Sequence, residues 1–315
     1  MDPVLAVNID FLVQQLVNGV TLGSLYALIA LGYTMVYGIL KLLNFAHGDV
    51  YMIGAFIGLG VLNALGGPLD PSVPIGVLVM LMFVAAMLGS GVLGVVIERF
   101  AYRPLRNAPR IAPLISALGV AFFLQSSALL LFGAQFRSYE TYEYIDLLGG
   151  IHRGPLNISW PRVLAIVSAF ALMVALLVLV WRSRLGKAMR ATSFDREAAA
   201  MMGIDVDRVI MATFFIGSAL AGAAGVMFGL VYFSIYHLMG FTAGLKGFTA
   251  AVIGGIGSIP GAMVGGLVIG LAEALATGYL PQGSTFQSFY VFVLLIVVML
   301  VRPAGLFGRA ELKKV

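Results

Sequence analysis

The sequence predicts an all-α protein, a polytopic membrane helix bundle with about eight or nine membrane segments. Of its 315 residues, 61 % are hydrophobic and only 10 % are charged, whereas soluble domains carry about 25 % charged residues. Long apolar runs alternate with short polar loops, and Lys and Arg gather in those loops, a pattern typical of membrane proteins. We expect a single transmembrane domain over residues 1–315.

Seven apolar runs are candidates for membrane helices, which need about 17–25 residues to cross the hydrocarbon layer. They cover residues 13–40, 50–66, 74–97, 111–133, 161–181, 209–231 and 287–301. The last run is followed by Arg302, Arg309, Lys313 and Lys314. We expect each run to form a helix, with a basic segment after the last one.

The basic loops set the expected orientation, because Lys and Arg are retained on the cytoplasmic side. Loops 99–110 and 182–208 and the segment after residue 301 are expected in the cytoplasm. Alternation of sides then puts the N-terminus and the loop 134–160 outside, and requires residues 233–286 to cross an even number of times. The Lys and Arg residues left outside or within the membrane are Arg137, Arg153, Arg162 and Lys246.

The region 245–278 is predicted to be a broken or re-entrant hairpin. Its apolar sequence is interrupted by GGIGSIPG at residues 254–261, where the glycines and Pro260 disfavour a continuous helix. The first arm is short, so both a full span and a re-entrant half-helix are compatible with it. Discontinuous helices of this kind often line transport pathways.

The docking loop, residues 182–208, contains a polar stretch, RATSFDREAAAMMGIDVDR, at residues 190–208. Thr192 is expected to cap a helix of about nine residues, with Asp195 completing a capping box and Gly203 ending it in a left-handed turn. The helical period puts Phe194, Ala198, Met201 and Met202 on one side. This helix either lies on lipid headgroups or docks a soluble partner.

The external loop 134–160 allows two interpretations. Its residues 139–146 are rich in Tyr, Glu and Asp. It either receives a partner outside the membrane or is a solvated loop with interfacial tyrosines.

The sequence lacks the residues that several kinds of catalytic and metal-binding sites require. The chain has no Cys, which excludes disulfides and thiolate sites, and its three His residues have no metal-binding spacing. It has no phosphate-binding loop of the G-x-x-x-x-G-K-[ST] type and no Ser, His and carboxylate grouping. We therefore expect no catalytic residues, no metal and no cofactor in this chain. Lys and Arg in loops are expected in a membrane protein, where they set its orientation. They therefore do not indicate a nucleic-acid site.

Polar side chains within the apolar segments are functional candidates, because charged groups are costly there. Glu273 is either a pathway residue or a buried partner of a hydroxyl, an amide or a Lys. Asn44, His47 and Asp49 lie in NFAHGD, where they are either functional groups or ordinary turn residues at a cytoplasmic turn. The candidates for the translocation pathway are Asn44, His47, Gln125, Lys246, Gly254, Gly255, Gly257 and Glu273.

Two long motifs carry a resemblance to a known family. NGVTLGSLYALIALGYTMVYGILKLLNFAHGDVYMIGA (18–55) and KGFTAAVIGGIGSIPGAMVGG (246–266) closely resemble LivH-type permeases of bacterial branched-chain amino acid ABC importers. IERFAYRPLR (97–106) and GIDVDRVI (203–210) are similar to the same family. Within the docking loop, the EAA-x-x-x-G pattern by which importer permeases contact their ATPases is matched by Glu197, Ala198, Ala199 and Gly203.

The resemblance implies a permease subunit that moves branched-chain or related amino acids into the cytoplasm, in the bacterial inner membrane. The implied partners are a related second permease chain of the LivM type, two cytoplasmic ATPase subunits that bind the ATP, and a periplasmic binding protein, besides membrane lipid. The residues implied in ATPase docking are Phe194, Glu197, Ala198, Ala199, Met201, Met202 and Gly203.

Other functions remain open at this point. A gradient-driven secondary transporter would couple transport to an ion through Glu273 and Lys246 and would need no ATPase. An ABC permease for small amides such as urea would share the same architecture. An intramembrane enzyme lacks a catalytic constellation.

Overall fold

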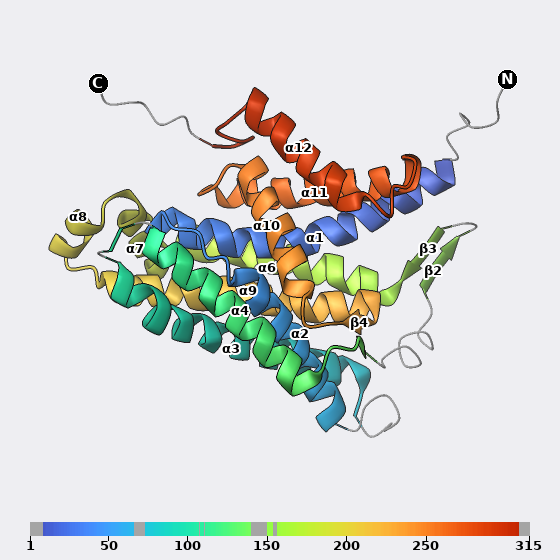
Figure 1. Ribbon diagram of the computed structural model, residues 1–315, viewed down its shortest axis with the longest axis horizontal. Helices are drawn as coiled ribbons and strands as arrows, with labels where there is room; N and C mark the ends of the chain where they lie inside the picture. Colours follow the sequence, from blue (N-terminus) through green and yellow to red (C-terminus); the bar gives the residue numbers. More distant parts are fainter. Residues whose placement is uncertain are drawn as a thin grey trace.

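The computed structural model describes residues 9–65, 73–106, 108–109, 111–139, 150–153 and 156–308. It is a bundle of long helices with short strands near one end, so the predicted all-α class is confirmed (Figure 1). The long helices are α1 (Ile9–Leu40), α2 (His47–Ala64), α3 (Ile75–Ile97), α4 (Ile111–Phe132), α6 (Trp160–Arg182), α9 (Val206–Tyr232), α10 (Met239–Gly254), α11 (Ile259–Tyr279) and α12 (Gln287–Val301).

Six helices in the described part of the chain are long and apolar enough to cross a membrane, namely α1, α3, α4, α6, α9 and α11. Helix α3 continues beyond Ile97 through a π-helical turn (Glu98–Tyr102) and a 3₁₀ turn (Arg103–Leu105). Helices α2 and α10 are not among the six, and α12 is a shorter apolar helix. A polytopic bundle is therefore confirmed, whereas the total of eight or nine segments stays a prediction.

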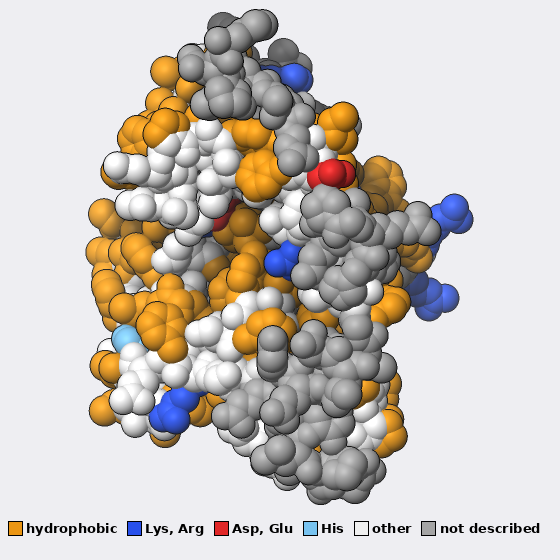
Figure 2. Space-filling view, turned by 90° about the vertical axis from the view of Figure 1, so that its right-hand side faces the viewer, with side chains coloured by type: hydrophobic (Ala, Val, Ile, Leu, Met, Phe, Trp, Pro, Cys, Tyr) orange, Lys and Arg blue, Asp and Glu red, His pale blue; other side chains and the backbone are white. Residues whose placement is uncertain are grey.

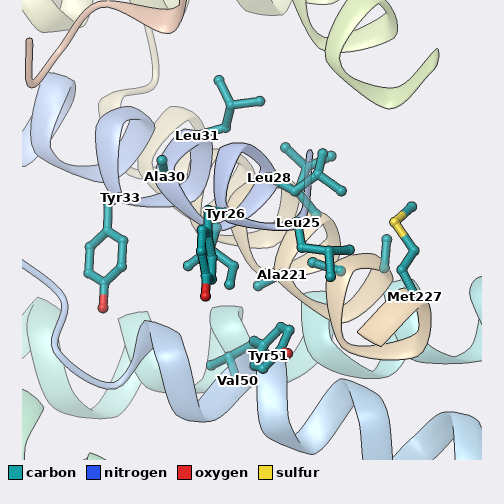
Figure 3. Packing of buried hydrophobic residues seen from close by; sticks show 14 of the residues in the cluster. Leu25, Tyr26, Leu28, Ala30, Leu31, Tyr33, Val50, Tyr51, Ala221 and Met227 are labelled. Carbon is teal, nitrogen blue, oxygen red and sulfur yellow. The ribbon is translucent and has the colours of Figure 1, made fainter. Parts of the chain in front are cut away.

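Helices α1 and α9 form the centre of the bundle. In their most apolar stretches 89 % and 83 % of the residues are buried, against 28–33 % in α3, α4 and α6. Figure 3 shows Tyr26 and Tyr33 pointing from α1 towards α2, which carries Val50 and Tyr51. The peripheral helices turn large apolar side chains outwards, as a membrane-facing surface requires.

Small residues allow α1 and α11 to pack backbone against backbone. A Cβ added at Gly23 would lie 2.8 Å from the Cα of Leu267, and one added at Gly270 would overlap the backbone of Gly23. Rows of small residues at four-residue spacing commonly permit such close helix contacts in membranes. The contact fixes α1, which carries Tyr26, against the hairpin arm that carries Glu273.

A Gly270→Leu substitution is expected to destabilise the bundle by about 3 kcal/mol, because its side chain meets the backbone of α1, which cannot rotate away. The thermal midpoint in detergent and the monodisperse fraction measure this effect. Gly119→Leu on α4 is the matched control, since nothing lies within 4 Å of a Cβ there. Equal losses in both variants would contradict the proposed packing.

The predicted broken hairpin is present. Helix α10 ends at Gly254, and the two glycines that follow have positive φ, 102° at Gly255 and 95° at Gly257. The Ser258 hydroxyl then caps α11 by accepting a hydrogen bond from the N–H of Gly261 at 3.2 Å. Helix α10 has 16 residues, and its last carbonyls, those of Ile253 and Gly254, accept hydrogen bonds from Leu306 and Phe307, which follow α12. The choice between a full span and a re-entrant half-helix stays a prediction.

Helices α2 and α10 both begin inside the bundle. After α1 ends at Leu40, the chain turns back so that His47 packs against Gly32, about two helical turns inside the end of α1. There Gly48 meets the first turns of α10, with a Cβ at Gly48 lying 2.7 Å from the Cα of Gly244. The N-termini of two discontinuous helices therefore meet within the protein.

The docking loop and the strands lie at opposite ends (Figure 1). The docking loop forms α7 (Arg184–Phe194) and α8 (Arg196–Met201). At the other end β2 (Gly150–Arg153) pairs with β3 (Leu156–Ser159), near the start of α1, and β1 (Arg137–Ser138) pairs with β4 (Ser234–Ile235). Of the predicted external loop, residues 140–149 and 154–155 lie outside the described residues.

Candidate functional site

The docking loop folds into two capped helices rather than one. The Ser183 hydroxyl caps α7, and the Asp195 carboxylate caps α8 by accepting hydrogen bonds from the N–H groups of Glu197 (2.9 Å) and Ala198 (3.0 Å). The prediction that Thr192 caps a helix of about nine residues is wrong. Thr192 is buried inside α7, and the extended backbone at Asp195 starts a helix of six residues. The left-handed turn at Gly203 is confirmed, with φ of 81°.

Large apolar side chains project from this loop into open space. Phe194 is 95 % exposed, and Met201 and Met202 are each 82 % exposed. We call these three residues the docking face. Beneath it Ala199 is buried and Ala198 partly buried, while Glu197 is exposed. Exposed apolar groups on a capped helix are typical of a protein contact surface.

Ion pairs and hydrogen bonds tie the docking loop to the centre of the bundle. The Arg196 guanidinium donates to the carbonyl of Ile39, at the end of α1, from Nε (3.0 Å) and Nη2 (2.6 Å). Arg103 and Arg106 both pair with Asp207 in the first turn of α9. Arg196 therefore joins α8 to the end of α1, and Arg103 and Arg106 join the segment after α3 to the start of α9.

The sequence analysis did not predict these ion pairs and hydrogen bonds between the docking loop and the bundle, which we call the anchoring network. Arg106 also pairs with Glu98, whose side chain is completely buried at the end of α3. A signal was present, because Glu98 is an acid directly after an apolar run and an unpaired buried carboxylate is very costly. The motifs IERFAYRPLR and GIDVDRVI, noted for their resemblance, contain both sides of the network.

A polar cluster lies where α2 and α10 meet. The Asn44 side chain accepts hydrogen bonds from the N–H of Ala46 and the hydroxyl of Tyr102, both at 3.2 Å. Gln125 on α4 donates to Asp49 at 3.0 and 3.2 Å. The interpretation of NFAHGD as a turn is supported, since the carbonyl of Asn44 accepts a hydrogen bond from the N–H of His47 at 3.1 Å. Its expected place at the surface is not, because all three polar side chains of this motif are buried inside the bundle.

His47 sits at the centre of that junction. Its ring lies edge-on to Tyr33 with the ring centroids 4.9 Å apart, and its Nε2 atom has no hydrogen-bond partner among the described residues. A cavity of about 40 Å³ next to it is lined by Tyr33, Gln125 and Gly244. This cavity is too small to hold an amino acid.

Lys246 and Glu273 form a buried ion pair across the hairpin. The Lys246 Nζ atom lies 2.6 Å from Glu273 Oε1, and the Tyr26 hydroxyl donates to Oε2 at 3.1 Å. Both charged side chains are only 4 % exposed. Of the two roles considered for Glu273, the geometry favours a buried partner, because its two oxygens are both taken by groups of the protein.

The predicted pathway residues fall into separate groups. Asn44, His47 and Gln125 surround the junction of α2 and α10, and Lys246 pairs with Glu273 further along α10. The three glycines lie instead at the hairpin break, where the N–H groups of Leu306 and Phe307 donate to the carbonyls of Ile253 and Gly254. Viewed from the end that carries the strands, the surface has a recess in which an acidic side chain is visible (Figure 2).

No group of three or more His, Asp or Glu within the described ranges is placed to hold a metal ion. The polar clusters consist of amides, hydroxyls, the His47 ring, the Asp49 carboxylate and one closed ion pair.

Comparison with known families decides the assignment. Residues 15–301 match the family described as branched-chain amino acid transport system / permease component. The chain belongs to this permease family. The resemblance predicted from the motifs is thereby confirmed, and with it a multi-pass membrane transport protein.

Relatives cover this permease along its whole length. The high-affinity branched-chain amino acid transport system permease protein LivH of Escherichia coli K12 is 45 % identical over 97 % of this chain and 98 % of its own length. The corresponding protein BraD of Pseudomonas aeruginosa is 46 % identical over 96 % of this chain and 97 % of its own length. A probable LivM permease of Methanocaldococcus jannaschii is 26 % identical over 90 % of both chains.

Proposed function

We propose that this permease is the membrane subunit of a bacterial ABC importer that carries branched-chain amino acids into the cytoplasm. In this proposal one of two ATPase subunits binds the docking face, a LivM-like permease chain completes the membrane part, and a periplasmic binding protein delivers the substrate. The end with the docking loop and residues 302–308 faces the cytoplasm, and the end with the strands faces outwards. ATP is bound by the partner subunits.

The docking face is the observation that carries the proposal. Three large apolar side chains stand exposed around α8: Phe194 ends α7 directly before the Asp195 cap, and Met201 and Met202 lie at the end of α8, before the left-handed turn at Gly203. Burying them in a partner subunit removes apolar area from water, which is favourable by roughly 25 cal/mol per Å². The neighbouring basic loop 99–110 supports a cytoplasmic location for this surface.

The anchoring network gives the docking loop a mechanical role. When the ATPases close, they would move α8, and the hydrogen bonds of Arg196 would transmit that movement to α1. Asp207 links the same region to α9. At Gly32, α1 approaches α9 so closely that a Cβ on Gly217 would lie 3.2 Å from the Gly32 Cα. Rigid-body movement of these helices would open and close the route alternately.

The junction of α2 and α10 supports a zwitterionic substrate. Helix N-termini present unpaired N–H groups and a partial positive charge, which suit a carboxylate. Aromatic rings of Phe45, Tyr33 and Phe248 stand around the junction and would tolerate an apolar side chain. Because the cavity there is small, transport requires α2 and α10 to separate.

Reconstitution tests the proposal directly. Proteoliposomes that contain this permease, its LivM-like partner, the ATPase subunits and the binding protein are expected to take up labelled leucine only with ATP on the ATPase side. An ionophore is expected to leave uptake unchanged, and isoleucine and valine to compete where urea does not. Uptake that persists without the ATPases and collapses with the ionophore would support a gradient-driven transporter instead.

A further inference from the structure

A basic cavity lies beside the docking loop. It has a volume of about 280 Å³ and is lined by three cationic side chains from separate elements, Lys41, Arg106 and Arg196. Lys41 belongs to the link between α1 and α2, Arg106 follows α3, and Arg196 is the first residue of α8. Pro113, in the first turn of α4, forms another part of the wall. The cavity is distinct from the docking face and from the junction of α2 and α10.

Positive charge is in excess around this cavity. Arg106 is balanced by Glu98 and Asp207, with Arg103 sharing Asp207. Within the described part of the chain, neither Lys41 nor Arg196 forms an ion pair. Arg196 donates only to a backbone carbonyl, and Lys41 lies 5.8 Å from the ring centroid of Tyr37.

Two further details indicate room for an anion. The buried Nε–H of Arg106 has no partner among the described residues. Burial, and next the positive charge of Arg106, lower the pKa of Arg196. An anion between these guanidinium groups would offset the repulsion.

The position favours a phosphate group at the membrane surface. The cavity lies at the end of α4, a peripheral helix whose Ile111, Phe122 and Phe123 turn outwards. Lipid phosphates occupy this level of a bilayer, just beyond the hydrocarbon that α4 faces. Basic pockets between membrane helices are a common binding mode for anionic headgroups.

We propose that the basic cavity binds a phosphate group, supplied by the headgroup of an anionic lipid, and that the bound group clamps α8 to the ends of α1 and α3. The same chemistry would accept soluble phosphate, so the experiment separates the two sources. The proposal concerns this chain alone and holds whether or not the chain imports branched-chain amino acids.

Lipid binding to the purified full chain, followed by native mass spectrometry, tests the proposal. Phosphatidylglycerol is expected to remain bound where phosphatidylcholine is lost. Lys41→Gln is expected to weaken retention about fivefold, and Lys41→Gln with Arg196→Gln by about 25-fold. Arg196→Lys keeps the charge and is expected to retain most of the binding. Lys187→Gln removes an exposed Lys from α7 and is the matched control, expected to change nothing.

The outcomes separate the alternatives. Equal retention of both lipids, or equal loss in Lys41→Gln and Lys187→Gln, overturns the proposal. Competition with millimolar inorganic phosphate distinguishes the sources: unchanged lipid binding supports the headgroup, and displacement of the lipid together with direct phosphate binding overturns the lipid source. If Arg196→Gln fails to fold, Lys41→Gln alone decides, because the Lys41 side chain makes no hydrogen bond within the described residues.

Discussion

Glu273→Gln is expected to destabilise the permease by about 3–5 kcal/mol, because it leaves the Lys246 ammonium buried without a counter-charge. Lys246→Met is expected to have an effect of similar size, since it leaves the Glu273 carboxylate buried without a counter-charge. The double variant Lys246→Met with Glu273→Leu removes both charges and is expected to recover most of the lost stability. Thermal midpoints and monodisperse fractions in detergent measure all three.

The pair formed by Arg208 and Asp205 is the matched control. Its atoms lie 2.8 Å apart, but its side chains are 83 % and 51 % exposed, so losing it is expected to cost at most about 1 kcal/mol. If the double variant is as unstable as the single ones, burial of unpaired charge is not the cause. A stable double variant without transport would instead support a pathway role for the pair.

Phe194→Ala together with Met202→Ala is expected to weaken binding of the ATPase subunits at least 100-fold and to reduce ATP-driven uptake in proportion. Anchor residues at the centre of an interface contribute about 2 kcal/mol or more each when truncated. Because both side chains are almost fully exposed, the substitutions are expected to leave the stability of the chain itself unchanged. Affinity is measured with purified ATPase and the permease in nanodiscs.

Phe123→Ala with Leu130→Ala is the corresponding control, since these residues are exposed on α4, away from the docking loop. Normal ATPase affinity is expected there. If the docking-face variant and the wild type bind the ATPase with equal affinity, the docking face is not the ATPase-binding surface.

The membrane helices could be predicted from hydropathy, because a long apolar run in lipid can form all its backbone hydrogen bonds only as a helix. The predicted runs at 111–133 and 287–301 differ from α4 and α12 by one residue at most. The break after Gly254 was equally visible, because only glycine tolerates the backbone at Gly255 and Gly257.

The burial of the start of α2 inside the bundle could not be predicted from hydropathy. The NFAHGD motif is polar, and a polar motif after an apolar run looks the same at a membrane surface and inside a protein. Its burial depends on contacts with Gly32, with Gly244 and with Tyr102, which lie far apart in the sequence. The link from Arg103 to Asp207 likewise spans 104 residues and becomes visible only in three dimensions.

The most direct test of the account uses the absence of Cys from the chain, which makes an introduced Cys the only thiol of this subunit. Met202→Cys, treated with a thiol-reactive crosslinker in the assembled membrane complex, is expected to give an adduct with the ATPase subunit. Phe136→Cys, which is also exposed but next to β1 at the opposite end, is expected to give none. An adduct from both positions, or from Phe136→Cys alone, would contradict the docking face and the importer mechanism built on it.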